Sequence, residues 1–87
     1  MNTTTTDIRQ QVTAIVLETI KNSVNEDQVV DEASLKNDLG MDSLDAEECL
    51  MDIETLFKIV ITYEEKEGIS TVKDLISIVE KKISEKQ

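Results

Sequence analysis

The sequence predicts an all-α protein, a four-helix bundle with three longer helices and one short third helix. Apolar residues recur at three- and four-residue steps in three stretches, and two capping-box patterns mark where the last two helices begin. The single strand-like run has no second run to pair with. A chain of 87 residues predicts one domain, at residues 7–84, with a modest core of Ile, Val and Leu.

The first helix is predicted over residues 7–21, after a polar segment at residues 1–6 that we expect to be disordered. Its apolar face consists of Ile8, Val12, Ile15, Val16 and Ile20. A long polar connection follows, from Asn22 to Met41, and five apolar side chains are expected to pin it onto the bundle: Val24, Val29, Val30, Leu35 and Leu39. Long ordered loops often carry function, and this one leads to Ser43.

The second helix is predicted over residues 43–57, with Ala46, Leu50, Ile53 and Phe57 on its inner face and Cys49 beside them. The rest of its surface is acidic, through Asp42, Asp45, Glu47, Glu48, Asp52 and Glu54. A solvated face is the ordinary explanation of such a run, and acids near a helix N-terminus also favour the helix dipole. Because the helix contains no basic residue and the first one after it is Lys58, we interpret this surface as a docking face for proteins with basic surfaces.

Two further helices complete the predicted bundle. Residues 59–61 are expected to be a buried connector. Thr62 and Glu65 form a capping box for a short third helix that ends before Gly68. A second capping box, Thr71-Val72-Lys73-Asp74, opens the last helix, which runs to about residue 84. The apolar face of that helix is Val72, Leu75, Ile76, Val79 and Ile83.

The most informative stretch is Asp-Leu-Gly-Met-Asp-Ser-Leu-Asp, at residues 38–45. Gly40 permits a backbone bend that a residue with a Cβ would resist, and Asp42 and Ser43 are both favoured where helices begin. A side chain at Ser43 lies beside the positive end of the helix dipole, a favourable place for a covalently attached phosphate. An ordinary capping role for Ser43 is the alternative interpretation.

This stretch and the acidic helix that follows it closely resemble the bacterial-type acyl carrier proteins, and the resemblance covers residues 8–83. Further marks of the family are Ser34-Leu35, Phe57 and Ile69-Ser70-Thr71-Val72. In that family the serine of the Asp-Ser-Leu motif is esterified with 4′-phosphopantetheine. The resemblance therefore implies a carrier-type helical bundle with Ser43 as the attachment site and Asp42 beside it. A phosphopantetheinyl transferase would load the arm from coenzyme A, and acyl groups would then be held on it as thioesters.

The resemblance also implies partner contacts on the second helix, at Leu44, Asp45, Glu48 and Met51, to which we add the neighbouring acid Glu47. The sequence departs from the family at three places: Glu47 replaces an apolar residue of the typical fatty-acid carriers, Leu35 replaces a common phenylalanine, and Thr62-Tyr63 replaces the usual Pro-Asp. The family implies fatty acid biosynthesis. A dedicated carrier for a specialised lipid, polyketide or aminoacyl pathway is one alternative, and an unmodified acidic interaction module is another.

Composition argues against several other classes of function. The chain has no histidine, so Ser43 and Cys49 lack the usual base, a zinc site has too few ligands, and we expect no catalysis and no metal site. Cys49 is expected to be a buried core residue. A net charge of −10 argues against nucleic acid or an anionic membrane as partner. With no pattern of a signal peptide or membrane span, we expect a cytoplasmic monomer that binds acyl-transferring enzymes.

The charge imbalance leads to a prediction about stability. Nineteen acidic residues face nine basic ones, so the folded state repels itself at neutral pH and low salt. Millimolar Mg²⁺ or Ca²⁺, or mild acidification that neutralises carboxylates, should therefore raise the Tm measured by circular dichroism. A Tm that divalent cations leave unchanged would contradict this expectation.

Overall fold

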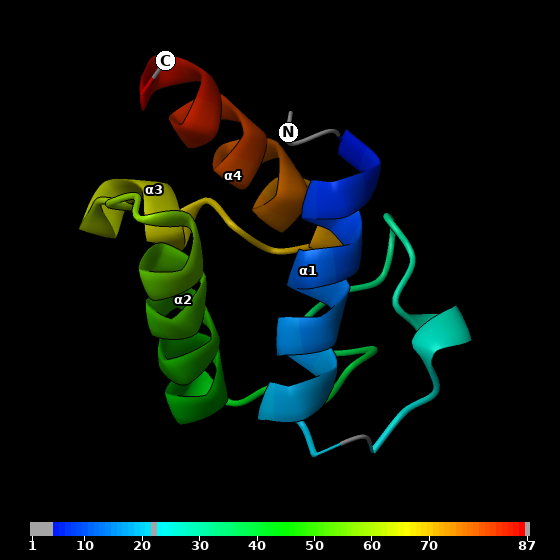
Figure 1. Ribbon diagram of the computed structural model, residues 1–87. Coiled ribbons are helices and arrows are strands. Elements are labelled where there is room, and N and C mark those ends of the chain that lie inside the picture. The colour runs from blue at the N-terminus through cyan, green and yellow to red at the C-terminus, as the bar shows by residue number, and fades with distance from the viewer. Residues whose placement is uncertain (1–4, 22, 87) are drawn as a thin grey trace.

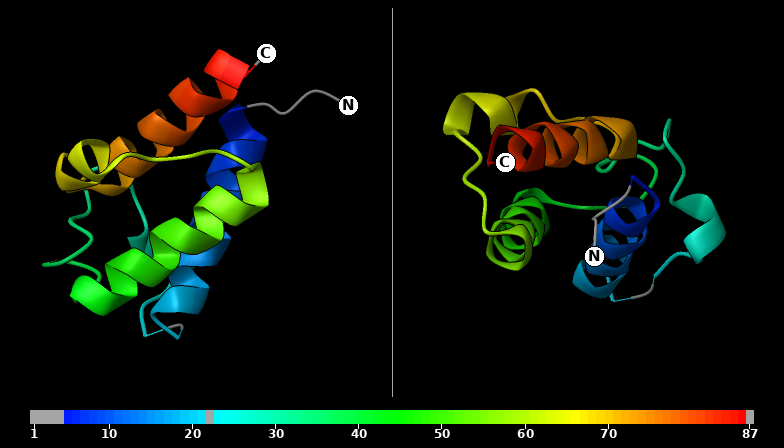
Figure 2. Two further views of the ribbon diagram at one scale, coloured as in Figure 1. Left: turned by 90° about the vertical axis from the view of Figure 1, so that its left-hand side faces the viewer. Right: turned by 45° about the horizontal axis from the view of Figure 1, so that its top comes forward.

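The protein is a helical bundle, as the sequence predicts. The computed structural model describes residues 5–21 and 23–86, which form four α-helices and one 3₁₀ helix, with no strand (Figure 1). These elements are α1 (Thr5–Thr19), η1 (Glu26–Gln28), α2 (Ser43–Phe57), α3 (Tyr63–Glu67) and α4 (Val72–Lys86). α1 packs against both α2 and α4, and the short α3 lies between α2 and α4 (Figures 1 and 2).

The predicted helix faces form one aliphatic core. Its innermost side chains are completely shielded from solvent: Val12 and Val16 of α1, Ile53 of α2, and Val72, Leu75 and Val79 of α4. Members at the edge of each predicted face are only partly buried, namely Ile15, Ala46, Phe57 and Ile83. The spacing of apolar residues therefore identified the packed faces correctly and slightly overstated their width.

The connection from α1 to α2 is held by side chains and by the backbone. Four of the five predicted pinning residues contact the core: Val24, Val29, Leu35 and Leu39. The prediction is wrong for Val30, which is 49% exposed, because the turn closed by the hydrogen bond from Ala33 N to Val30 O directs Ala33 inward instead. Ser34 also pairs with Thr71 in an isolated antiparallel bridge, which ties the connection to the start of α4.

The first helix begins and ends two residues earlier than predicted. Its C-terminal boundary moves because Lys21 has a φ of 56°, in the left-handed region that an α-helix does not continue. Thr5 and Thr6, expected in the disordered segment, belong to α1. The rest of that segment lies outside the described residues. At the other end of the chain, α4 extends two residues beyond the prediction, and Lys86 Nζ donates to the carbonyl oxygen of Phe57 at 3.1 Å.

The connector between α2 and α3 is buried only in part. Ile59 and Ile61 are buried, but Val60 between them is 74% exposed, so the prediction is wrong for Val60. Alternate side chains of an extended segment point to opposite sides, which explains the pattern. Lys58, with a φ of 56°, ends α2 in a left-handed turn that no glycine in the sequence had indicated.

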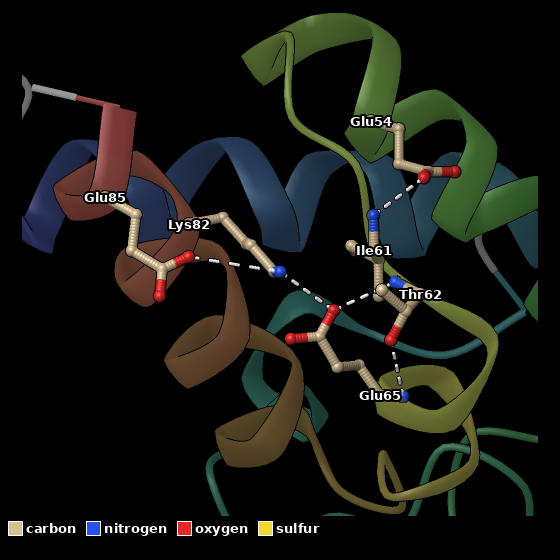
Figure 3. Close-up of polar contacts among 6 residues, drawn as sticks. All are labelled: Glu54, Ile61, Thr62, Glu65, Lys82 and Glu85. Atoms are coloured by element: carbon tan, nitrogen blue, oxygen red, sulfur yellow. Dashed lines mark hydrogen bonds and ion pairs between the residues drawn. The ribbon is translucent and has the colours of Figure 1, made fainter.

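Both predicted capping boxes are confirmed. Glu65 N donates to Thr62 Oγ1 at 3.2 Å, and Thr62 N donates to Glu65 Oε1 at 2.9 Å (Figure 3). Thr71 and Asp74 make the same reciprocal pair at the start of α4. Glu65 also forms an ion pair with Lys82 of α4 at 2.9 Å, so one carboxylate both begins α3 and joins it to α4 (Figure 3).

These contacts predict how stability depends on acid. The backbone N–H of Thr62 and the ammonium of Lys82 lower the pKa of Glu65 from 4.5 to about 2. A carboxyl with a depressed pKa in the folded state stabilises the fold above its unfolded pKa and loses that contribution as the pH falls toward the folded one. Glu65→Gln should therefore lower the Tm at pH 7, and its deficit should shrink as the pH falls from 4.5 toward 2.

Glu64→Gln is the matched control, because Glu64 is an exposed neighbour on the same helix. Thermal scans across this pH range should show no comparable change in the difference between Glu64→Gln and wild type. A Tm deficit of Glu65→Gln that is the same at pH 7 and pH 2 would contradict the assigned role of Glu65.

Candidate functional site

Ser43 is the first residue of α2 and is exposed to solvent. Gly40, with a φ of +75°, makes the predicted bend in the chain just before it. The helix cap itself is made by two carboxylates. Asp45 N donates to Asp42 Oδ1 at 2.8 Å, and Asp42 N donates to Asp45 Oδ2 at 3.3 Å. Asp42 is thus the N-cap, and the hydroxyl of Ser43 is not part of that pair.

Two surface grooves meet at Ser43. The α2–α3 groove has a volume of about 590 Å³ and is lined by Ser43, Ala46, Glu47, Leu50, Met51, Tyr63, Lys66 and Glu67. The loop-side groove has a volume of about 380 Å³ and is lined by Ser34, Leu35, Lys36, Asn37, Met41, Asp42, Ser43, Ala46, Ile69 and Ser70. A flexible group attached to Ser43 has both grooves directly beside it.

A small inner cavity of about 50 Å³ adjoins both grooves. Its lining is apolar except for Lys66, and consists of Leu35, Met41, Ala46, Cys49, Leu50, Lys66, Ile69 and Leu75. The cavity shares Ala46, Leu50 and Lys66 with the α2–α3 groove. A volume of this size holds roughly one or two water-sized groups, so a longer alkyl chain fits only if the walls move apart.

Cys49 lines this cavity and is buried, as predicted. Burial raises the pKa of its thiol to about 12. The thiolate is the reactive form of cysteine, so Cys49 is a packing residue with little nucleophilic character at neutral pH.

The predicted partner-binding residues are displayed unevenly on α2. Leu44 and Met51 are 73% and 61% exposed, and Glu47 and Glu48 are also exposed. Asp45 is partly buried and completes the cap of α2, a structural role in addition to the predicted one. The structure brings Ser43, Glu47 and Met51 together along the α2–α3 groove, whereas Leu44 and Glu48 line neither groove.

Glu54 does not belong to the docking face to which the sequence assigned it. Its Oε2 accepts a hydrogen bond from Ile61 N at 2.9 Å, and its Oε1 lies 3.6 Å from Lys66 Nζ (Figure 3 shows the first contact). The carboxylate therefore stabilises the connector and α3. The side chain of Glu54 contacts residues that follow α2 in the sequence, and the position of an acid in the sequence does not reveal such contacts.

Sequence reasoning missed three residues of the α2–α3 groove, namely Tyr63, Lys66 and Glu67 of α3. Tyr63 is 75% exposed and lies across the groove from Met51, on the other helix. The capping box had correctly placed Tyr63 at the start of a third helix. No local pattern shows that this helix lies beside Ser43, because that placement depends on how the connector crosses the core.

Two further kinds of feature, a cluster of metal-ligating side chains and a membrane-spanning helix, are absent from the described residues. Among them, no cluster of three or more His, Cys, Asp or Glu side chains is positioned to hold a metal ion. No helix within residues 5–21 and 23–86 combines the length and apolar character needed to cross a membrane.

Comparison with known proteins identifies the family. A family model described as a phosphopantetheine attachment site matches residues 10–79. The chain belongs to this family. It is also 43% identical to an acyl carrier protein of Thermotoga maritima over 77 residues, which cover 88% of this chain and 93% of that protein. The chain is therefore an acyl carrier and not a catalyst, and it works with acyl cargo and with the enzymes that act on that cargo.

The prosthetic group of the family is covalently attached 4′-phosphopantetheine. The geometry around Ser43 fits such a group. The hydroxyl is exposed at the N-terminus of a fifteen-residue helix, where the dipole favours a phosphate, and two grooves lead away from it.

Proposed function

We propose that Ser43 carries the 4′-phosphopantetheine arm of a carrier domain spanning residues 7–84, which holds acyl intermediates for fatty acid biosynthesis. The observation that carries the proposal is the position of Ser43, an exposed serine beside the N-cap of α2 from which both grooves start. The arm supplies its own thiol, so the buried Cys49 is not needed for thioester formation.

Loading requires a phosphopantetheinyl transferase, coenzyme A and Mg²⁺. A bond forms between Ser43 Oγ and the phosphorus that bears the pantetheine. The pyrophosphate bond of coenzyme A breaks, and adenosine 3′,5′-bisphosphate leaves. The hydroxyl proton passes to a base of the transferase, since the side chains that surround Ser43 at the cap are carboxylates already engaged in hydrogen bonds.

The exposed acids and apolar side chains of α2 support a docking role. Glu47 and Glu48 present negative charge to basic enzymes, and Leu44 and Met51 add apolar contacts beside it. We further propose that the carrier acts as a monomer, because the same face of α2 must meet the transferase and each later enzyme in turn.

The pathway is tested by the cargo. Straight-chain acyl groups of graded length on the native protein support fatty acid biosynthesis. A single hydroxylated, branched or aminoacyl cargo would instead support the dedicated carrier. Glu47 and Tyr63 are the observations that favour this second candidate, because both departures from the typical fatty-acid carriers line the α2–α3 groove.

Loading of Ser43 can be measured directly by intact mass. Incubation with coenzyme A, Mg²⁺ and a broad-specificity transferase should add the mass of one phosphopantetheine group. Ser43→Ala should abolish this gain while leaving the helical circular dichroism unchanged, because Ser43 is exposed and takes no part in the cap pair. Ser34→Ala and Ser70→Ala are the controls, since both serines line the loop-side groove, and both variants should still be loaded.

Charge reversal at Glu48 tests the docking face. Glu48→Lys should slow loading at low salt by roughly tenfold, equivalent to about 1.4 kcal/mol, and the loss should shrink at high salt. The Tm should change little because Glu48 is exposed. Glu18→Lys makes the same charge reversal on α1 and should leave the rate near that of wild type. Equal losses for the two variants would contradict a docking surface on α2.

A further inference from the structure

The two walls that enclose the inner cavity are held by different kinds of contact. On the loop side, backbone hydrogen bonds fix the wall: Leu35 N donates to Ser70 O at 3.0 Å, and Met41 N donates to Leu35 O at 2.9 Å. Leu35 and Met41 both line the cavity, so widening it on this side requires breaking backbone hydrogen bonds.

The wall formed by α3 is held mainly by side chains. None of the five residues of α3, all of them described, is buried. Glu65 is joined to Lys82 of α4, and Lys66 is joined to Glu54 of α2. Partly exposed ion pairs are weaker than buried apolar packing, so we expect α3 to be the wall that yields if the cavity expands.

Lys66 lies between the inner cavity and the α2–α3 groove, where the cavity would have to widen. It is the one charged residue among those lining the inner cavity, and it also lines the α2–α3 groove. Its Nζ reaches across to Glu54 Oε1 at 3.6 Å, which links α3 to α2. The hydrogen bond from Ile61 N to Glu54 Oε2 keeps the carboxylate in place. Separating α2 from α3 therefore breaks the contact between Lys66 and Glu54.

We propose that Lys66 determines how long an acyl chain the inner cavity admits, because its ion pair with Glu54 tethers α3 to α2. The proposal rests on Ser43 as the attachment site. A long alkyl chain that enters the cavity must break the tether, whereas short or polar cargo lies in the α2–α3 groove and leaves it intact. Removal of the tether should therefore favour burial of longer aliphatic cargo.

The test compares two loaded forms of each variant. A transferase that accepts acyl-coenzyme A attaches either the free arm or the octanoyl arm to wild type, Lys66→Met, Lys66→Ala and Lys81→Met. The measured quantity is the rise in Tm from the free-arm form to the octanoyl form, so the effect of each substitution on the unloaded fold cancels. Lys81→Met is the matched control, because Lys81 is an exposed lysine of α4 that lines neither the inner cavity nor the α2–α3 groove.

The rise in Tm should be several degrees larger in Lys66→Met than in wild type, larger again in Lys66→Ala, and unchanged in Lys81→Met. Methyl NMR gives an independent readout, since Leu75 lines the inner cavity and not the α2–α3 groove, whereas Met51 lines the groove and not the cavity. Octanoylation should change mainly the chemical shift of the Met51 methyl in wild type. In Lys66→Ala it should change mainly the chemical shifts of the Leu75 methyls.

Three results would overturn the inference. The Leu75 methyls could shift as much in wild type as in Lys66→Ala, the Tm rise could be the same with and without Lys66, or Lys81→Met could match Lys66→Met. Failure of coenzyme A to add mass to wild type would overturn the proposed function, and this inference with it.

Discussion

The reciprocal hydrogen bonds between Asp42 and Asp45 are the constraint on which the site depends. A helix N-terminus has N–H groups that need acceptors. Here the Asp42 carboxylate accepts the N–H of Asp45, and the Asp45 carboxylate accepts the N–H of Asp42. The cap therefore does not use the hydroxyl of Ser43, which stays exposed at the first position of α2. Had Ser43 been the N-cap, its hydroxyl would accept a backbone hydrogen bond and would be held against the helix end.

The acidic residues of this chain divide into two groups with different roles. Asp42, Glu54 and Glu65 each accept a backbone N–H, and together they fix the start of α2, the connector and the start of α3 (Figure 3 shows the last two). Glu47 and Glu48 are exposed on α2. Local hydrogen bonds therefore stabilise some of the carboxylates, while the net charge of −10 is spread over exposed acids on α2 and on other elements.

The short α3 connects stability to function. It contributes no buried side chain, yet it forms one bank of the groove that starts at Ser43 and one wall of the inner cavity. Its attachments are ion pairs to α2 and α4, so its position responds to charge more than to apolar packing. The rest of the bundle is packed around completely shielded aliphatic residues of α1, α2 and α4, whereas α3 contributes no buried side chain to that core.

Local sequence determined most of the helices of this protein. Helical spacing and capping residues act within one or two turns, so they placed α2, α3, the start of α4 and the candidate serine. Features that depend on contacts between distant segments were decided only by the tertiary structure. Val30 and Val60 turn outward, Glu54 binds the connector, and Tyr63 and Lys66 lie along the groove at Ser43. The groove depends on how α3 packs between α2 and α4, and the outward directions of Val30 and Val60 depend on the turn at Ala33 and on the extended connector; the spacing of apolar residues encodes none of these.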